Sequence, residues 1–470
     1  MSSSSSSSTL PNASMLCGDE VPGVVIDIGS SFCKFGSAGQ DAPHHVFRSD
    51  TATYLNENTN KNNKNTESTD MEVEESNNTN KDLHPAHRIV CGDMPLRNIV
   101  PNVTINRTTS FNEKDNIDVI DWERVEAIFD YALNNLMKID TTIYPLMLTE
   151  SIFKTLPDKT KLVELLFEKF ETPGIYIAKD AMFSSFCAGR ATSLVVDLGA
   201  SGTTITPIID GYSLTNSTIR SNRGGDWLDA QLSTALTTAG HTIRPWFDAG
   251  DRQGKLTDIS QSLYKLHQTD VIREVKSWMC FVPRDRNIIA DNDRAAFIKA
   301  LRIPQFELPD KTMVSATEGI CLLPEQLVMP SGKTMTERLP TPQQQELLLP
   351  PHALENMTMN PNTDSLQELI LTAVAKCDID VRRDLLNNIV LVGGGALIDG
   401  LSNRLTSELS LSLPSTMKPK IVPMIDVEKR FAPWIGGSIL SICGSFQQLW
   451  LSKKEFEDYG PNLIAKRFNK

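Results

Sequence analysis

Several features that would mark common classes of protein are missing from this chain. None of its eight cysteines forms a CxxC pair, which argues against a disulfide framework or a zinc knuckle and favours a reducing compartment. No apolar run approaches the roughly 20 residues that a membrane-spanning helix needs. The N-terminus is a serine run with neither a basic nor an apolar segment, so it is not a secretory signal. These absences predict a soluble intracellular protein with no membrane contact.

Long basic runs are missing as well, and the overall charge is acidic. The 470 residues include 58 Asp and Glu against 46 Lys and Arg, which gives a net charge of −12. Because the phosphate backbone of nucleic acids attracts positively charged proteins, strong direct binding to DNA is not expected. The length of the chain and its 40% hydrophobic content are sufficient for two or more cores.

Two low-complexity segments contain little that a core could bury. Residues 1–17 are rich in serine, and residues from about 54 to 84 are rich in Asn, Thr, Glu and Ser. Such polar composition predicts disorder. The second segment interrupts a foldable region, which is typical of a surface insertion. Its composition fits a spacer without a role and a regulatory element equally well.

A pattern of an apolar run, an aspartate and a small-residue turn occurs twice. The first copy spans residues 24–31 (VVIDIGSS) and the second spans 194–201 (LVVDLGAS), and a further β-rich run follows each copy. The pattern predicts a buried strand that turns sharply into a hairpin partner. Glycine lets backbone N–H groups approach a ligand closely, so such turns can hold phosphate oxygens. Two copies in one chain predict two similar lobes that grip one polyphosphate between them.

A glycine triplet, Gly393–Gly395, follows a predicted strand at 389–392. After the triplet, leucines recur every four residues, which predicts one face of a helix. These leucines are Leu397, Leu401, Leu405 and Leu409. A strand, a glycine turn and a helix together place backbone amides at a phosphate or a base, so we expect a third wall of the site here. Further predicted elements are a helix capped by Asp121, a helix at 162–170 and a strand at 175–178.

These motifs resemble those of the actin family. Residues 27–39 are similar to the first phosphate loop of actin, and residues 171–178 and 188–192 are similar to the segment that leads into its second loop. Residues 434–440 and 446–455 are similar to the C-terminal helix of actin. The resemblance covers residues 18–48 and 87–470. It implies an α/β actin-like fold, in which two lobes of duplicated, mixed five-stranded sheet with flanking helices surround a nucleotide cleft.

The resemblance also implies how the chain is divided into lobes. The first lobe, actin subdomains 1 and 2, is expected at residues 18–187 and 431–470, and it carries the insertion at about 54–84. The second lobe, actin subdomains 3 and 4, is expected at residues 188–430. Residues 1–17 form a disordered N-terminus outside both lobes.

Within the family, five segments are most similar to nuclear actin-related proteins. They are residues 18–21, 199–204, 276–280, 376–382 and 429–435. This similarity implies a location in the nucleus and a structural and regulatory role in chromatin-remodelling and histone acetyltransferase complexes. The implied partners are monomeric actin, an amphipathic helix of a remodeller motor or scaffold subunit, and histones, whose basic charge an acidic protein complements.

The implied ligand is ATP with Mg²⁺ or Ca²⁺. Asp27 and Asp197, one in each repeat, suit a hydrated cation because hard carboxylate oxygens ligate both ions, usually through water; a capped turn is the alternative for either residue alone. Lys34 can reach phosphate oxygens as a point charge. The expected nucleotide-binding residues are Asp27, Gly29, Ser30, Ser31, Lys34, Asp197, Gly199, Ala200, Ser201, Gly393, Gly394, Gly395 and Arg430.

Asp180 stands where actin has the glutamine that orients the attacking water. Ala200 and Thr204 match an aspartate and a histidine that lie near this water in actin, and Ser31 matches a glycine. An aspartate can position water or act as a base, but its charge repels a γ-phosphate unless the cation screens it. We therefore assign no catalytic residue and expect ATP binding with little or no hydrolysis. The alternative for Asp180 is a solvated residue of the cleft.

The competing hypothesis is an enzyme, an active ATPase of the actin type. A working actin should keep the glutamine and the polymerising loop, and the polar insertion takes the place of that loop, so filament formation is not expected. A sugar kinase on the same superfold is disfavoured by the actin-like tail. A chaperone is disfavoured because no substrate domain follows the cleft in the sequence.

The resemblance further implies a partner groove between the two base subdomains. Grooves of this kind accept amphipathic helices. The matching residues are Phe186, Gly189, Leu440, Cys443 and Leu449. The alternative is that these residues belong to the core.

Overall fold

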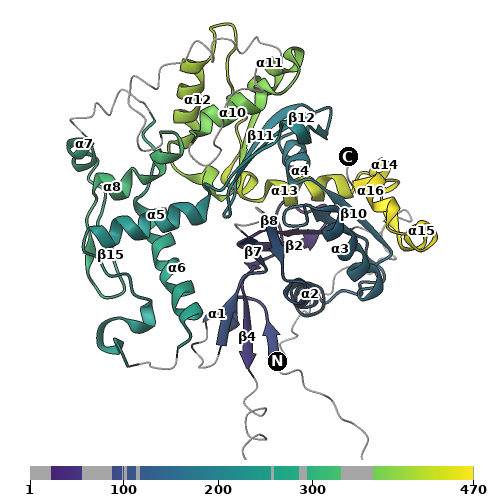
Figure 1. Ribbon diagram of the computed structural model, residues 1–470, viewed down its shortest axis with the longest axis horizontal. Coiled ribbons are helices and arrows are strands. Elements are labelled where there is room, and N and C mark those ends of the chain that lie inside the picture. Colours follow the sequence, from purple (N-terminus) through teal and green to yellow (C-terminus); the bar gives the residue numbers. More distant parts are fainter. Residues whose placement is uncertain are drawn as a thin grey trace, which may run out of the picture.

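The computed structural model describes residues 23–55, 87–97, 99, 103–112, 117–255, 259–284, 294–329 and 364–468. The serine-rich N-terminus and nearly all of the insertion lie outside these residues, so the disorder expected for them stays a prediction. Strand β4 (Thr51–Leu55) extends into the range assigned to the insertion, which therefore starts later than expected. The described chain forms two large sheets flanked by helices, and smaller sheets lie toward one end (Figure 1).

The first large sheet is built around the first copy of the repeated pattern, in the order β18-β10-β9-β1-β2-β3. Strands β1 (Val24–Ile28) and β2 (Phe32–Ser37) form an antiparallel hairpin, whereas β1 and β9 (Leu146–Thr149) are parallel. Every residue of β1 is buried, as expected of a strand covered on both faces. The other strands are β3 (His45–Arg48), β10 (Gly174–Ala178) and β18 (Leu451–Ser452).

The second large sheet repeats this arrangement around the second copy. Strand β11 (Ser193–Leu198) is antiparallel to β12 (Thr203–Ile209) and parallel to β17 (Ile389–Val392). Strands β13 (Tyr212–Ser213) and β14 (Ile219–Ser221) both pair with β12. The predicted pair of mixed sheets is confirmed. The second sheet has five strands, and the first has six because the tail adds β18.

Two helices of the first lobe begin at caps that the sequence provides. Helix α2 (Trp122–Asp130) begins after Asp121, whose side chain accepts the Arg124 N–H, and it continues as a π-helix, η3 (Tyr131–Met137). Helix α3 (Leu156–Glu168) begins at a capping box of Thr155 and Asp158. The helix expected at 162–170 therefore starts earlier and ends sooner than predicted.

The helix behind the glycine triplet differs from its prediction at one end. Gly394–Leu397 form a 3-10 turn, η10, and α12 spans Leu401–Ser412. The buried face predicted at four-residue spacing holds from Leu401 onward, but the prediction for Leu397 is wrong because it precedes the helix and is partly exposed. Gly400, with a φ of 77°, separates the two segments in a left-handed conformation that favours glycine.

Helices α4 (Asp180–Cys187) and α13 (Asp426–Ser441) pack against each other and contact the cores of both large sheets. Their approach is close, since a Cβ at Gly436 would lie 1.8 Å from the carbonyl oxygen of Phe183. Trp434 is fully buried, and its Nε1–H donates to the Val25 carbonyl at 3.0 Å. Pro433 lies inside α13, two residues after a kink at Phe431. This helix pair connects the two lobes beneath the site.

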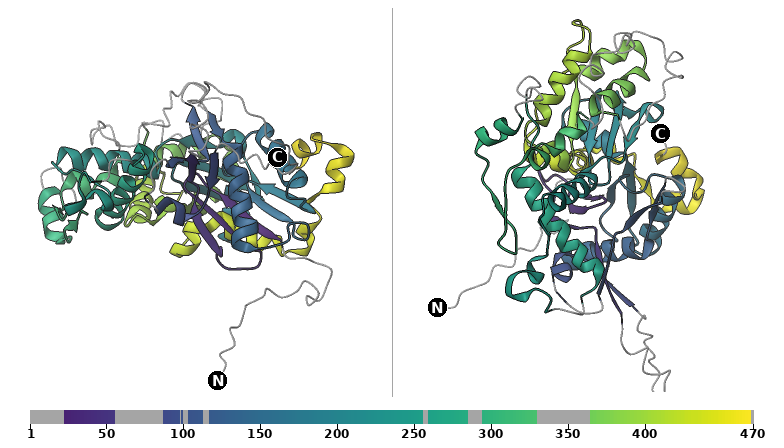
Figure 2. Two further views of the ribbon diagram at one scale, coloured as in Figure 1. Left: turned by 90° about the horizontal axis from the view of Figure 1, so that it is seen from below. Right: turned by 60° about the vertical axis from the view of Figure 1, so that its left-hand side comes forward.

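The tail is not the single helix that the resemblance implied. After α13 it forms α14 (Gly444–Gln447), strand β18, α15 (Lys453–Tyr459) and α16 (Asn462–Phe468). The chain leaves the helical path because β18 pairs with β10 at the edge of the first sheet. The tail therefore packs on the first lobe, where its yellow ribbon is seen in both views of Figure 2.

The remaining elements form the two smaller sheets near α1, a two-stranded sheet and the helical cover of the second lobe. In chain order they are β5 (His87–Val90), α1 (Asp93–Arg97), β6 (Val103–Asn106), β7 (Thr109–Asn112), β8 (Ile117–Ile120), η4 (Thr215–Ser217), α5 (Gly225–Thr238), η5 (Trp246–Asp248), η6 (Gly250–Arg252), α6 (Gln261–Met279), α7 (Arg294–Leu301), β15 (Phe306–Glu307), β16 (Met313–Val314), α8 (Glu318–Cys321), η8 (Leu323–Leu327), α10 (Leu366–Ala375) and α11 (Ile379–Asn387).

Candidate functional site

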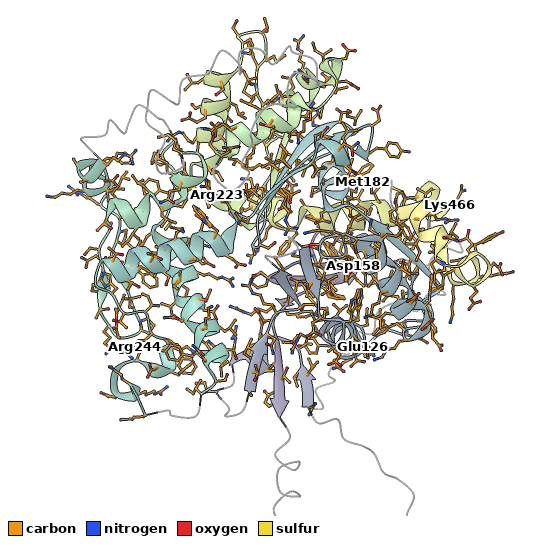
Figure 3. All side chains as sticks on the ribbon, in the orientation of Figure 1. Glu126, Asp158, Met182, Arg223, Arg244 and Lys466 are labelled. Atoms are coloured by element: carbon orange, nitrogen blue, oxygen red, sulfur yellow. The ribbon has the colours of Figure 1, made fainter. Side chains whose placement is uncertain are left out.

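The two repeated hairpins meet at one cavity of about 880 Å³. Their turns are closed by the same hydrogen bond, from the Gly29 N–H to the Phe32 carbonyl at 3.0 Å and from the Gly199 N–H to the Gly202 carbonyl at 2.9 Å. The cavity is lined by residues of both lobes, which are marked in Figure 3 by Arg244 on the second lobe and Glu126 on the first. The sequence repeat thus produces two equivalent turns that face one space.

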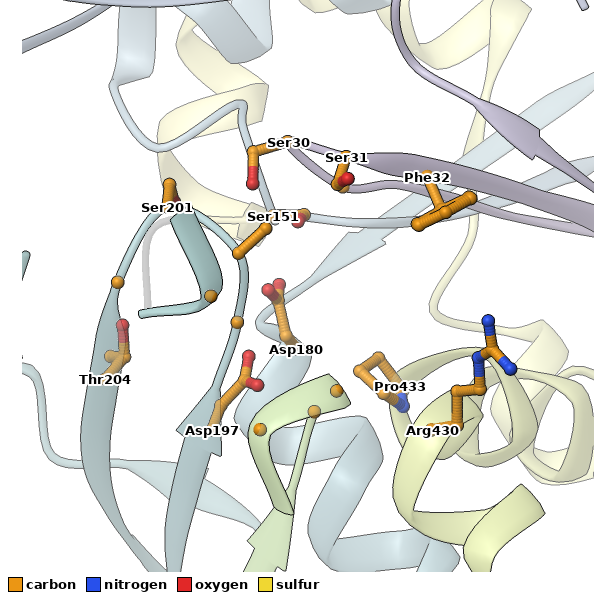
Figure 4. Close-up of a pocket in the computed structure, with 18 of the residues that line it drawn as sticks. Ser30, Ser31, Phe32, Ser151, Asp180, Asp197, Ser201, Thr204, Arg430 and Pro433 are labelled. Atoms are coloured by element: carbon orange, nitrogen blue, oxygen red, sulfur yellow. The ribbon is translucent and has the colours of Figure 1, made fainter. Parts of the chain in front are cut away.

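Every residue expected to bind nucleotide lines this cavity. Ser30 and Ser31 come from the first turn, Ser201 from the second, and Arg430 from α13 (Figure 4). Asp180, at the first position of α4, lines it as well. The full set at the cavity wall is Asp27, Gly29, Ser30, Ser31, Lys34, Asp180, Asp197, Gly199, Ala200, Ser201, Gly393, Gly394, Gly395 and Arg430.

The glycine triplet lies directly against the second hairpin. Gly393 has a φ of 87°, and a Cβ on it would lie 2.4 Å from Asp197 Oδ1 and 2.5 Å from the Leu198 carbonyl oxygen. By contrast, a Cβ on Gly394 would meet nothing within 4 Å. Only glycine therefore fits at position 393, because both the backbone conformation and the close approach exclude a side chain.

Asp27 is held between two partners at the end of β1. Its two carboxylate oxygens accept from Lys34 Nζ at 2.6 Å and from Thr149 Oγ1 at 2.7 Å. Burial lowers the pKa of Lys34, but the charge and hydrogen bond of Asp27 outweigh it, so this pKa lies above its ordinary value. Lys34 is opposite Asp27 in the β1–β2 register, and Thr204 is opposite Asp197 in the second hairpin. The cationic side chain is thus present in only one of the two copies.

Two further carboxyl groups point into the same cavity (Figure 4). Burial, together with the charges of Asp27 and Asp197, raises the pKa of Asp180 to about 7. Burial also raises the pKa of Asp197 to about 6, although Lys34 opposes this shift. Because the three carboxyl groups repel one another, the cavity favours a proton or a cation among them.

A second group of charged residues lines the cavity where α5 and α6 meet, and the sequence reasoning did not assign it to the site. Arg273 Nε donates to Asp229 at 2.9 Å, and its Nη2 donates to Asp226 at 3.0 Å. Lys276 Nζ donates to the Gly225 carbonyl at 3.2 Å and also pairs with Asp229. The sequence signal that could have found this group is a spacing of three residues, which separates Asp226 from Asp229 on α5 and Arg273 from Lys276 on α6.

Glu150 was missed as well, and it connects the cavity to the C-terminal helix. It lies just after β9 at the cavity wall and forms an ion pair of 2.9 Å with the buried Lys159. Lys159 Nζ also donates to the Phe468 carbonyl at 2.9 Å. The partner of Glu150 comes from α3 and the tail, so sequence spacing alone gave no indication of it.

The residues expected to form a partner groove lie near the contact of α4 and α13, but their exposure differs. Phe186 and Leu440 belong to one apolar cluster, and Leu440 is only 7% exposed, so it contributes to the core. Cys443 is exposed and Leu449 is 50% exposed. Gly189 has a φ of 64°, with open space around it. Ile439 and Ile442, at 44% and 53% exposure, are further apolar side chains on this surface.

The geometry suits a phosphorylated ligand with a cation. Among the described residues, no three His, Cys, Asp or Glu side chains converge to hold a metal ion by themselves. A cation at Asp27 and Asp197 would therefore need oxygens from a ligand or from water to complete its coordination, as Mg²⁺ usually does. The helices of the described residues include none that is long and apolar enough to span a bilayer.

Two lobes with repeated hairpins around one cavity define the class of actin-fold proteins, and the chain belongs to the actin family, which matches it over residues 18–469. Similar curated proteins include actin-related proteins. Actin-related protein 4 of Yarrowia lipolytica (strain CLIB 122 / E 150) is 31% identical over 475 residues, covering 98% of this chain and 98% of that protein. Actin-related protein 4 of Arabidopsis thaliana is 31% identical over 470 residues, covering 96% of this chain and 100% of that protein. Actin-related protein 4 of Oryza sativa subsp. indica is 29% identical over 473 residues, with the same two coverages.

Proposed function

We propose that this actin-related protein binds ATP with Mg²⁺ or Ca²⁺ in the cavity, hydrolyses it little or not at all, and serves as a non-polymerising structural subunit of nuclear complexes. The observation that carries the proposal is the convergence of both hairpin turns and the glycine triplet on one cavity of about 880 Å³. Turns of this kind present backbone N–H groups, which suit phosphate oxygens.

The residues present fit a nucleotide with its cation. Asp27 and Asp197 would hold the hydrated ion, and Lys34 would stay close to the phosphates because it is already fixed by Asp27 at 2.6 Å. A bound cation would lower the mutual repulsion of the carboxyl groups of Asp27, Asp180 and Asp197. It would also screen the phosphate charge of the ligand.

Slow turnover is supported by the chemistry at Asp180. Burial and two neighbouring aspartates raise the pKa of this group to about 7 in the empty site. An ionised Asp180 repels an incoming phosphate, and a protonated one cannot accept a proton from water. Neither form replaces the neutral amide of a glutamine, so the site is better suited to holding a nucleotide than to cleaving it.

The proposed role in chromatin-remodelling and histone acetyltransferase complexes, and the location in the nucleus, rest on the resemblance to nuclear actin-related proteins. The exposed apolar side chains Ile439, Ile442 and Leu449 support a surface for an amphipathic helix of a motor or scaffold subunit. Monomeric actin is the second proposed partner. Histones are the third, since the net charge of −12 complements basic proteins.

The test is the nucleotide content and turnover of the purified protein. The denatured extract is separated by chromatography, and phosphate release is followed over hours beside conventional actin as the positive control. Stoichiometric ATP that stays intact is the expected result. Bound ADP with steady phosphate release would instead establish an active ATPase, and an empty cleft would leave a scaffold without nucleotide.

The partner proposal needs its own experiment. An amphipathic helical peptide from a remodeller motor subunit is titrated into the wild type and into the double variant Ile439→Asp and Ile442→Asp, with Leu411→Asp, at an exposed position of α12, as the control on another surface. The double variant should weaken binding by at least tenfold, because it places charges in an apolar contact. Equal binding by all three proteins would exclude this surface.

A further inference from the structure

Both hairpin turns at the cavity have their carbonyl oxygens held by hydrogen bonds, but the donors differ in kind. In the second turn, residues 199–202, the Gly199 and Ala200 carbonyls accept the N–H groups of Gly225 and Asp226, each at 2.9 Å. These donors are the first two residues of α5. The second turn is thus held by backbone donors alone.

In the first turn, residues 29–32, a side chain takes over part of this task. Ser49, which directly follows β3, donates from its Oγ to the Gly29 carbonyl at 2.6 Å. Its backbone N–H donates to the Ser31 carbonyl at 3.0 Å. Ser49 is 1% exposed and is not among the described residues that line the cavity. It therefore holds the turn from behind and does not touch a ligand in the cavity.

The Ser49 hydroxyl is itself fixed by two buried neighbours. Thr108 Oγ1 donates to the Ser49 carbonyl at 2.6 Å, and Cys33 Sγ lies 3.3 Å from Ser49 Oγ. Because the hydroxyl proton of Ser49 is directed to Gly29, the Cys33 thiol is the donor in the second contact. Burial raises the pKa of this thiol to about 12, so the thiol keeps the proton that it donates.

We propose that Ser49 is a positioning residue of the cavity, whose hydroxyl holds the Gly29 carbonyl so that the Ser30 N–H faces the phosphates of a bound nucleotide. The inference rests on the proposed function, because it requires a phosphorylated ligand. The Gly29–Ser30 peptide bond is trans, and in a trans peptide group the C=O and the N–H point in opposite directions. A carbonyl drawn toward Ser49 therefore turns the Ser30 N–H away from Ser49, toward the cavity that Ser30 lines (Figure 4).

Loss of the Ser49 hydroxyl should act on phosphate binding in particular. Without it, the Gly29 carbonyl loses a buried donor, and the peptide group is free to turn toward other partners. A phosphate that binds the turn must then reorient this group, which lowers the affinity. Adenosine has no phosphate to place at the turn, so its affinity should not depend on Ser49.

The test compares the affinity for ATP with Mg²⁺ and the affinity for adenosine, by calorimetric titration of nucleotide-free, full-length protein. Ser49→Ala removes the hydroxyl and adds no volume. Ser438→Ala is the matched control, because Ser438 is also 1% exposed, its Oγ donates to the Gln40 carbonyl at 2.8 Å, and it lies outside the described cavity wall. Both variants should lower the melting temperature to a similar extent, since each loses one buried hydroxyl donor.

Ser49→Ala should bind ATP about fivefold more weakly than the wild type, the effect of one lost hydrogen bond, and should bind adenosine as the wild type does. Ser438→Ala should leave both affinities unchanged. An unchanged ratio of the two affinities in Ser49→Ala, or an equal change of this ratio in Ser438→Ala, would overturn the positioning role. A wild type that does not bind ATP would contradict the proposed function instead.

Hydrogen exchange at saturating ATP and Mg²⁺ gives a second readout, with the second turn as the internal control. In Ser49→Ala, residues 29–32 should exchange faster than in the wild type, whereas residues 199–202 should keep their protection. If Ser49→Ala does not fold, the same measurement is made on Thr108→Val, which removes the donor to the Ser49 carbonyl at nearly constant volume. Exchange of the first turn equal to that of the wild type would overturn the proposal in either variant.

Discussion

At the scale of single residues, three of the aspartates that line the cavity, Asp27, Asp180 and Asp197, repel one another. Asp27 is satisfied by Lys34 and Thr149, whereas the pKa values of Asp180 and Asp197 rise to about 7 and about 6. Each of these two groups binds its proton more tightly in the folded than in the unfolded protein. Their contribution to stability is therefore complete below pH 4 and is lost as the pH rises through 6 and 7.

In the nucleotide-free, metal-free protein, the contribution of Asp180 and Asp197 to stability should accordingly fall as the pH rises from 4 to 7. In Asp180→Asn this loss should be smaller, because the substitution removes the larger of the two pKa shifts. Thermal melts across this range give the comparison. Asp140→Asn is the control, because hydrogen bonds from Thr142 lower the pKa of Asp140 and give its contribution the opposite sign. A pH dependence that Asp180→Asn leaves unchanged would contradict the assignment.

Gly393→Ala should lower the free energy of unfolding by about 2 kcal/mol or more, because the residue adopts a conformation reserved for glycine. It should also weaken ATP binding, since relief of the clash would displace Asp197. Gly394→Ala is the matched control, because the added Cβ meets no atom within 4 Å. Urea unfolding and nucleotide titration distinguish the two variants. Equal effects at both positions would show that the close approach does not matter.

At the scale of elements, the tail is anchored to the first lobe through one buried lysine. Lys159 of α3 reaches both Glu150 at the cavity and the Phe468 carbonyl of α16. Lys159→Met should destabilise the protein by about 3–5 kcal/mol, since it leaves a carboxylate without its buried partner. Lys161→Met, an exposed position on the same helix, should cost far less. Urea denaturation measures both, and similar losses would contradict the anchoring role.

The elements that the sequence predicted well are those with a local signal. Asp121 and the 389–392 strand are examples, because a cap and a continuous apolar run act within a few residues. Leu397 and the tail were predicted less well. The break before α12 depends on Gly400, where a Cβ would lie 1.8 Å from the Val282 carbonyl oxygen. The end of α13 depends on a strand pairing with β10. Both causes are tertiary contacts.

The same distinction applies to the site. The hairpin turns and the glycine triplet could be predicted because each contains its own turn chemistry, and their convergence followed from the repeat. The positions of Glu150 and of the charged group around Arg273 and Lys276 could not be predicted. The lobes must first assemble to bring α5, α6 and β9 to one cavity.

At the scale of the whole molecule, the described residues connect the lobes through the helix pair α4 and α13 and, at their outer ends, through the buried cluster of Leu96, Val103, Ile105 and Leu263. We propose from the resemblance to actin that the polar insertion takes the place of the polymerising loop, and we therefore expect the protein to stay monomeric with Mg²⁺ and ATP. Sedimentation velocity at concentrations at which conventional actin polymerises gives the comparison. Filaments that pellet under these conditions would contradict a non-polymerising role.

The central claim is that one nucleotide with its cation sits between the two hairpins. The most direct measurement is calorimetric titration of stripped protein with Mg²⁺ and ATP, for the wild type and for the double variant Asp27→Asn and Asp197→Asn. The claim predicts one saturable site per chain in the wild type, weakened at least tenfold by the double variant or by a chelator. No binding to the wild type, or binding that neither the variant nor the chelator affects, would contradict it.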